Sequence, residues 1–180
     1  MSTWQLDTAH TVVSFAAKHM MITKVRGIFK GVTGAIDFDE TDPASSRVEV
    51  TIPAATIETG MEHRDNHLRS ADFLDAENHR TLTFVSTGIA PKGDRWAISG
   101  DLTIRGVARA VTLDAAPLGV VTGMDGRRHA GFEASVRIRR SEWGLGWNVG
   151  LEAGGWLVSD EIVIDLEVAA DEVAAAASGE

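Results

Sequence analysis

Apolar residues in this sequence recur at every second position over five separate stretches. These stretches are 13–18, 47–52, 81–84, 132–139 and 162–168. Successive side chains of a β-strand point to opposite faces of the sheet, so this spacing gives each strand one apolar face and one polar face. Such two-faced strands are typical of antiparallel sheets, whereas buried parallel strands are apolar on both faces. The sequence therefore predicts an all-β, antiparallel fold.

Turn signals between these stretches indicate a sheet that curls and closes. Asp125-Gly126 is typical of a type I′ hairpin turn, which needs positive φ angles at both central residues. A further tight turn is expected at 105–106. Three glycines in one strand region are expected to mark bulges or bends: Gly27, Gly31 and Gly34. Eight or nine short strands favour a barrel or a sandwich, and only closure removes every sheet edge. We therefore expect a closed antiparallel β-barrel of about eight strands.

One segment departs from the two-residue period and is predicted to be helical. Thr59 followed by Glu62 fits a capping box, in which the threonine side chain accepts a backbone N–H and the glutamate reaches back. We expect a helix from Met61 to near Ser70, and a second, shorter turn from Asp75 to Asn78. The barrel thus carries one or two short helices.

The length of the chain limits its domain organisation. A chain of 180 residues corresponds to about one domain and can bury a sizeable core. We expect the barrel to occupy residues 1–170. Residues 171–180 are expected to form a disordered tail, because chain ends without apolar anchors rarely pack.

Charge and composition exclude several classes of function. The formal net charge of −9 repels nucleic-acid phosphates. The absence of cysteine excludes disulfides, thiolate nucleophiles and thiolate metal ligands. No run of about 18 apolar residues occurs, so no membrane span is expected. Residues 1–7 show neither the basic nor the apolar part of a secretory signal, and a cytoplasmic location is therefore expected.

The main alternative to a binding protein is a metal-dependent enzyme that uses two histidines. His63 and His67 are four residues apart on the predicted helix, a spacing that can bring two ligands to one metal ion. Both lie off the apolar face and no third ligand stands nearby, so we expect surface or structural histidines. The sequence contains no nucleophile elbow, phosphate-binding loop or complete dinucleotide fingerprint. We therefore expect no catalytic residue, no metal site and no cofactor.

The predicted inward faces leave open whether the barrel is filled or hollow. An eight-stranded barrel is of a size that its own side chains can fill or that can hold one small ligand. A filled barrel would serve as a ligand-free interaction or stress-response module. The small inward residues Ala17 and Ala134, together with Gly27, Gly31 and Gly34, favour a cavity slightly. The periodicity alone supports both interpretations equally.

Short motifs follow one another in a specific order from Met1 to about Val168. They are the segments 4–10, 18–20, 25–29, 64–73, 82–87, 100–107, 140–144 and 158–162, together with Phe15. Their joint order resembles the YceI-like family, whose members are lipocalin-like antiparallel barrels. The resemblance implies binding of a long isoprenoid-type lipid, such as a polyprenyl phosphate or an isoprenoid quinone, along an apolar pore. It implies a carrier, store or sensor without catalytic activity, and it implies that a homodimer can form.

On this interpretation, the lipid tail lies against inward-facing side chains and the head group meets polar residues at the mouth of the barrel. The expected tail contacts are Phe15, Ala17, Phe29, Ile36, Phe38, Phe84, Leu102, Phe132, Ala134, Trp143 and Trp147. The expected head-group contacts are His19, Arg64 and Arg140. Arg64 can equally be a buried partner of Asp65 or Asp72. Each buried CH₂ group contributes about 0.8 kcal/mol, so the tail supplies the affinity and the mouth supplies the selectivity.

Overall fold

The computed structural model describes residues 1–39 and 41–173. The strands are β1 (Ser2–Leu6), β2 (Val12–His19), β3 (Thr23–Phe29), β4 (Thr33–Phe38), β5 (Arg47–Pro53), β6 (Thr81–Lys92), β7 (Arg95–Ile104), β8 (Val107–Thr122), β9 (Arg128–Arg139) and β10 (Val158–Glu172). The helical elements are α1 (Glu62–Arg69) and three 3₁₀ turns, η1 (Pro43–Ser45), η2 (Ala54–Thr56) and η3 (Arg140–Trp143).

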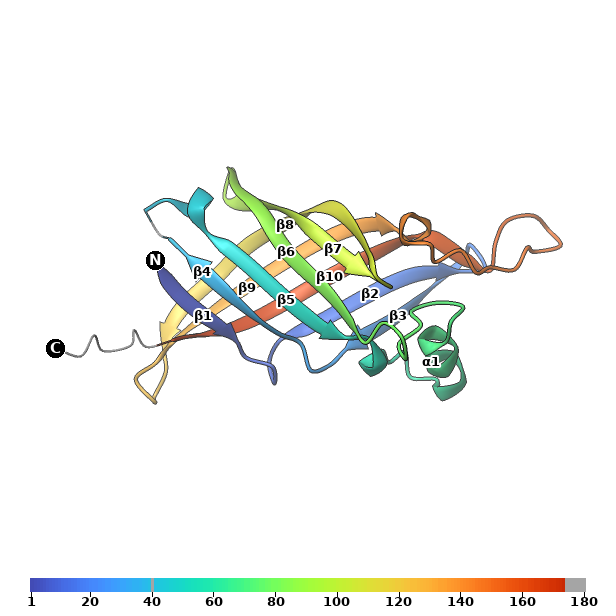
Figure 1. Ribbon diagram of the computed structural model, residues 1–180, viewed down its shortest axis with the longest axis horizontal. Coiled ribbons are helices and arrows are strands. Elements are labelled where there is room, and N and C mark those ends of the chain that lie inside the picture. Colours follow the sequence, from blue (N-terminus) through green and yellow to red (C-terminus); the bar gives the residue numbers. More distant parts are fainter. Residues whose placement is uncertain (40, 174–180) are drawn as a thin grey trace.

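The sheet closes into a ring in which two positions are each shared by two strands placed end to end, β1 with β2 and β4 with β3. β1 and β2 lie one after the other along β10, so that Leu6 stands opposite Ala170 and Val13 opposite Leu166. In the same way, β4 and β3 lie along β1 and β2. Ten strands therefore fill eight positions in a ring that runs from β1 through β4 to β10 and back to β1. The predicted closed antiparallel barrel of about eight strands, with one short α-helix, is confirmed (Figure 1).

The hydrogen bonding of the ring is weakest along the outer edge of β3. β3 is hydrogen-bonded to β2 on one side only. On the other side, within the described part of the chain, a single backbone bridge joins Ile28 and Glu58, each of which donates its N–H to the other's carbonyl at 2.9 Å. The Lys30 N–H adds a hydrogen bond to Thr56 Oγ1 at 3.0 Å. Elsewhere in the ring, ladders of several residue pairs connect neighbouring strands.

The barrel extends slightly beyond the limit predicted from the sequence. β10 continues to Glu172, which stands opposite Trp4 of β1. Asp171 and Glu172 therefore belong to the sheet and not to a tail. The rest of the predicted tail, residues 174–180, lies outside the described residues.

The predicted helix forms, but the predicted capping box does not. α1 begins after Met61, whose side chain makes no capping hydrogen bond. The Thr59 N–H and hydroxyl both donate to Asp65 Oδ1, and the Thr59 hydroxyl accepts from Arg64 Nε at 2.7 Å. Asp65 is buried, and a buried carboxylate needs hydrogen-bond donors. Thr59 therefore hydrogen-bonds the Asp65 carboxylate and does not cap the backbone N–H groups of the first helical turn.

The three glycines near β3 and β4 serve different purposes, and only one marks a bend. Gly31 has a φ of +69° and lies between the two strands, where the chain changes direction. Gly27 and Gly34 lie in uninterrupted ladders, so the predicted bulges at these positions are wrong. At Gly34 a Cβ atom would lie 2.2 Å from the carbonyl oxygen of Glu49. Close packing against neighbouring atoms, not strand bending, requires glycine at these two sites.

The barrel end that carries β1 is filled by its own side chains. Trp4 exposes 3% of its surface and lies in the core with Leu6 and Ile36. The Arg128 guanidinium lies 5.3 Å from the centroid of the Trp4 ring and pairs with Glu172 at 2.9 Å. α1 and the loop between β9 and β10 lie at the opposite end (Figure 1). The interior is therefore closed at the β1 end, which we call the filled end.

His129 links three segments at the filled end. Its Nδ1 lies 2.7 Å from Asp171 of β10, and its Nε2 lies 3.2 Å from Asp125 in the β8–β9 turn. Both ring nitrogens donate only when the imidazole is protonated. The hydrogen bond to Asp171, followed by that to Asp125, raises the pKa of His129 above its ordinary value.

This raised pKa predicts a loss of stability as the pH rises. The contribution of protonated His129 is complete below the unfolded-state pKa of about 6.5 and disappears as the pH passes through the higher pKa of the folded state. We expect the Tm of the wild type to fall over this interval relative to that of His129→Gln. Thermal melts followed by circular dichroism at a series of pH values measure this difference. Parallel Tm profiles of the two proteins would contradict the assignment.

Candidate ligand cavity

An apolar cavity of about 170 Å³ lies inside the barrel, between the filled end and α1. Its walls come from β2, β3, β5 to β10 and the loops at the α1 end. Of its 23 lining side chains, 22 are apolar, and Arg140 is the exception. The apolar set is Val13, Phe15, Ala17, Phe29, Val50, Ile52, Ile57, Leu68, Phe73, Leu74, Leu82, Phe84, Leu102, Ile104, Leu113, Val136, Ile138, Leu145, Val158, Ile162, Ile164 and Leu166. Such a lining binds a ligand mainly by removing hydrocarbon surface from water.

Two glycines let aromatic rings lie against the wall of the barrel. Phe15 stands opposite Gly27, where a Cβ atom would lie 2.3 Å from the end of the phenyl ring. Phe84 covers Gly100, where a Cβ atom would lie 2.5 Å from the ring. A side chain at either glycine would push the ring toward the middle of the barrel. The glycines therefore help to keep the interior hollow, as the sequence analysis expected of Gly27 but not of Gly100.

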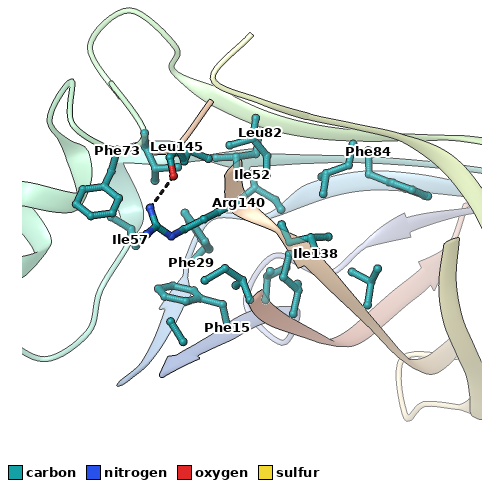
Figure 2. Close-up of a pocket in the computed structure, with 18 of the residues that line it drawn as sticks. Phe15, Phe29, Ile52, Ile57, Phe73, Leu82, Phe84, Ile138, Arg140 and Leu145 are labelled. Carbon is teal, nitrogen blue, oxygen red and sulfur yellow. Dashed lines mark hydrogen bonds between the residues drawn. The ribbon is translucent and has the colours of Figure 1, made fainter. Parts of the chain in front are cut away.

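The α1 end of the cavity is bordered by residues that come from loops and from α1. Ile57, Phe73 and Leu145 surround this end in Figure 2. The centroids of the Phe73 and Trp147 rings lie 5.3 Å apart. The His67 ring is nearly perpendicular to both, with its centroid 5.1 Å from that of Phe73 and 4.5 Å from that of Trp147. Sequence reasoning missed this border because these segments have no apolar period. The apolar pair Phe73-Leu74 directly after the helix was the available signal.

Arg140 is the one charged side chain that lines the cavity. It exposes 6% of its surface and donates to four backbone carbonyl groups. Nη1 donates to the oxygens of Leu145 at 2.6 Å and Trp147 at 2.9 Å, Nε to that of Ser159 at 2.9 Å, and Nη2 to that of Val158 at 3.4 Å. Figure 2 shows the bond to Leu145. Arg140 thus ties the β9–β10 loop to the mouth of the barrel.

Burial lowers the pKa of Arg140, and the nearby Asp160 carboxylate acts in the opposite direction. A guanidinium carries five N–H donors, and the hydrogen bonds within the described part of the chain use four of them. One N–H of Nη2 makes no hydrogen bond within the described part of the chain. The cavity wall contains no other group that can hydrogen-bond or exchange a proton through its side chain. This arrangement is suited to binding and offers no nucleophile or general base.

The structure brings five of the predicted tail contacts together in the cavity wall. They are Phe15, Ala17, Phe29, Phe84 and Leu102. The remaining six lie outside the lining: Ile36, Phe38, Phe132, Ala134, Trp143 and Trp147. Most of these six do face the interior, but at a different depth. Alternation along a strand identifies the inward face and contains no information about the distance from the mouth.

The position of each outlying residue has a local cause. Ile36 stands opposite Trp4 at the filled end. On β9 the lining consists of Val136 and Ile138, and Ala134 lies nearer the filled end. Trp143 is 1% exposed but packs outside the cavity, with its indole N–H donating to the carbonyl of Leu102 at 2.9 Å. Phe38 follows Ile36 on β4, and Phe132 precedes Ala134 on β9. Trp147 contacts His67 in the loops at the α1 end.

The predicted head-group contacts occupy three different environments. Arg140 lines the cavity. His19 stands opposite the lining residue Val158, at the next inward position after Ala17, and therefore at the rim. Arg64 lies outside the lining, where Nε and Nη2 donate to the side chain and carbonyl of Thr59. The alternative ion pairs of Arg64 with Asp65 or Asp72 do not form; Asp65 instead accepts from Thr59.

The two histidines considered as metal ligands lie on the same helix, α1, but have different surroundings. His63 is exposed, whereas His67 contacts Asp72 at 2.8 Å and the rings of Phe73 and Trp147. The described residues contain no cluster of three or more histidine, cysteine or acidic side chains able to hold a metal ion. They also contain no helix with the length and apolar character needed to cross a bilayer.

Comparisons with known proteins cover almost the entire barrel. The protein YceI of Escherichia coli O157:H7 is 38% identical over 141 residues, which are 78% of this chain and 74% of that protein. Among solved structures, Burkholderia cenocepacia BcnA is 27% identical with a TM-score of 0.78, covering 91% of this chain and 98% of that chain. The Campylobacter jejuni YceI protein is 32% identical with a TM-score of 0.73, covering 87% and 90%. A polyisoprenoid-binding domain from Saccharophagus degradans shares the fold at 13% identity, with a TM-score of 0.67 and coverage of 96% and 100%.

A family model described as the YceI-like domain matches residues 4–170, which span the barrel from Trp4 of β1 to Ala170 of β10. The ordered motifs, the closed eight-position ring and these matches agree over the same residues. The chain therefore belongs to the YceI-like family.

Proposed function

We propose that this protein binds an isoprenoid-type lipid, such as a polyprenyl phosphate or an isoprenoid quinone, with its tail in the cavity, and that it catalyses no reaction. The observation that carries the proposal is a cavity wall of 22 apolar side chains and one arginine. A hydrocarbon tail satisfies such a wall without an unpaired polar group, whereas a polar substrate would lose hydrogen bonds to water. The Saccharophagus degradans domain adds that a barrel of this fold can serve this purpose.

The volume of the cavity sets how much of the tail it holds in this conformation. A cavity of about 150 Å³ holds a benzene molecule. The present cavity of about 170 Å³ therefore holds about one isoprene unit. At about 0.8 kcal/mol per buried carbon, one unit supplies about 4 kcal/mol, which corresponds to a Kd of about 1 mM. Tight binding requires more of the tail to be enclosed, through a wider interior or through contacts at the mouth.

The head group is proposed to lie at the α1 end, near Arg140 and His19. The remaining Nη2 donor of Arg140 can reach a polar atom that follows the tail, and His19 stands at the rim. A carrier, a store and a sensor all require this same binding step. The homodimer and the cytoplasmic location expected from the sequence remain predictions.

Native mass spectrometry of protein purified without detergent tests the proposed function. We expect a bound lipid mass, or uptake of added polyprenols with an affinity that rises with tail length. Palmitate serves as a comparison of similar apolar area without branching. A protein that carries no lipid and takes up no polyprenol of any length would contradict the proposal.

A further inference from the structure

An apolar tip projects from the barrel at the α1 end. We define it by the exposed side chains of the β2–β3 turn and the loop 149–157: Met20, Met21, Ile22, Val149 and Trp156. Ile22 exposes 83% of its surface and Trp156 exposes 57%. Single exposed apolar residues are ordinary, but a group of them at one end of a molecule marks an interaction surface. In Figure 1 the loop between β9 and β10 extends well beyond the end of the barrel.

Direct contacts hold the two parts of the apolar tip together. The Met20 N–H donates to the carbonyl of Leu157 at 2.8 Å. Gly155 lies against Met21, because a Cβ atom at this glycine would be 3.2 Å from Met21 Cγ. Within the loop, Trp156 forms a backbone bridge with Gly150. The turn and the loop therefore present their apolar side chains as one surface.

The β2–β3 turn carries apolar residues where other residue types are favoured. Met20 and Met21 have φ angles of +50° and +63°, and the Ile22 N–H closes the turn on the carbonyl of His19 at 3.1 Å. Two consecutive positive φ angles strongly favour asparagine and glycine. Methionines at both positions supply large, flexible apolar side chains at the cost of backbone strain.

Basic residues flank the apolar tip in an otherwise acidic protein. Lys18 and Lys24 stand directly opposite each other on β2 and β3, and Arg26 follows on β3. All three are exposed, and within the described part of the chain none forms an ion pair. Residues 18–26 contain no acidic residue, and residues 144–157 contain only Glu152, although the whole chain has a net charge of −9. Like charges placed opposite each other repel, and an anionic surface would relieve this repulsion.

The apolar tip is also continuous with the mouth of the cavity. Val158 lines the cavity and stands opposite His19, the residue that precedes Met20. We propose that the apolar tip docks onto an anionic phospholipid bilayer, with its apolar side chains at the acyl boundary and the three basic side chains near the phosphates. Docking in this way turns the mouth of the cavity toward the bilayer. The proposed surface lies outside the cavity, so its test requires no cavity ligand.

Co-sedimentation with vesicles tests the proposal. We expect the wild type to bind vesicles of equal parts phosphatidylcholine and phosphatidylglycerol, to bind pure phosphatidylcholine more weakly, and to dissociate as salt screens the charges. The double variant Lys18→Gln/Lys24→Gln should bind the anionic vesicles at least about tenfold more weakly. Ile22→Ser/Trp156→Ser should lose binding to a similar extent on both kinds of vesicle, because it removes apolar area that enters the membrane.

Matched variants separate docking from folding and from lipid uptake. Leu118→Ser/Val121→Ser removes equally exposed apolar side chains at the far end of β8 and should bind vesicles like the wild type. Ala17→Phe, which fills the cavity, should also bind vesicles normally, whereas the variants of the apolar tip should still take up polyprenol added without vesicles. Wild-type protein that stays in the supernatant would overturn the proposal, as would an equal loss in the β8 control. A wild-type dimer that Ile22→Ser/Trp156→Ser converts to a monomer would assign the surface to a second copy and would overturn it too.

Discussion

Replacing Arg140 with methionine is expected to lower the free energy of unfolding by about 3–4 kcal/mol. The substitution keeps much of the side-chain volume but removes the donors to the carbonyl groups of Leu145, Trp147 and Ser159, whereas the Val158 carbonyl keeps its hydrogen bond from Asn148 Nδ2. Each buried unsatisfied group costs about 1–3 kcal/mol, and release of the buried charge offsets part of the sum. For a chain of this size the Tm should fall by about 10 °C. Chemical denaturation and thermal melts measure both quantities.

Two further variants show whether the hydrogen bonds of Arg140 are responsible. Arg140→Lys keeps the charge, but an ammonium cannot reach carbonyl groups arranged around a planar fork, so most of the loss should remain. Arg139→Met changes the neighbouring, exposed arginine and should alter stability by about 0.5 kcal/mol or less. A loss below about 1 kcal/mol for Arg140→Met would show that the loop does not depend on this residue.

Filling the cavity from Ala17 is expected to weaken polyprenol uptake by at least about a hundredfold. Ala17 lines the cavity on β2, two residues before His19 at the rim. The ring added by Ala17→Phe is about the size of a benzene molecule, which needs a cavity of about 150 Å³. That is nearly all of the 170 Å³ of open space. Native mass spectrometry and competition with a fluorescent apolar probe measure the loss of uptake.

The adjacent residue provides the control for this experiment. Ala16 has the opposite orientation on β2 and borders a shallow depression outside the barrel. Ala16→Phe adds the same ring to the same strand and should leave uptake unchanged. Uptake that survives in folded Ala17→Phe protein would place the lipid tail somewhere other than in this cavity. A strong loss of uptake in Ala16→Phe would attribute the effect to strand distortion.

The fold could be predicted because its main determinant is local. The alternation over 132–139 and 162–168 fixes which side chains face inward, and Asp125-Gly126 marks the turn between β8 and β9. The type I′ geometry predicted for this turn is wrong, because Gly126 has a positive φ of +77° and Asp125 does not. Both signals are contained in a few consecutive residues. The division of one strand position between β1 and β2 was not predictable, because it depends on where each segment meets β10.

The sequence predicted site residues correctly only where facing the barrel interior was enough to place a side chain in the cavity wall. Phe15 and Phe84 were identified as inward residues, but the glycines that hold their rings against the wall, Gly27 and Gly100, act across strands. Ile36 has the same periodicity as the lining residues and lies beside Trp4, because depth along the barrel depends on the stagger of the strands. Arg140 was expected at the mouth. Its four bonds to distant carbonyl groups, which fix the β9–β10 loop, had no sequence signal.

The single bridge between Ile28 and Glu58 determines how the barrel can expand. Separating β9 from β10, which are paired over eleven residues, would break a long row of hydrogen bonds together. Separating β3 and the adjoining Lys30 from the segment 54–60 breaks two backbone hydrogen bonds, the hydrogen bonds of Thr56 with Lys30 and the Lys30–Glu58 ion pair. Hydrogen-bonded ladders therefore join all neighbouring strands of the barrel except along the outer edge of β3. A ligand larger than the cavity of about 170 Å³ is therefore expected to be accommodated by separation along this edge of β3.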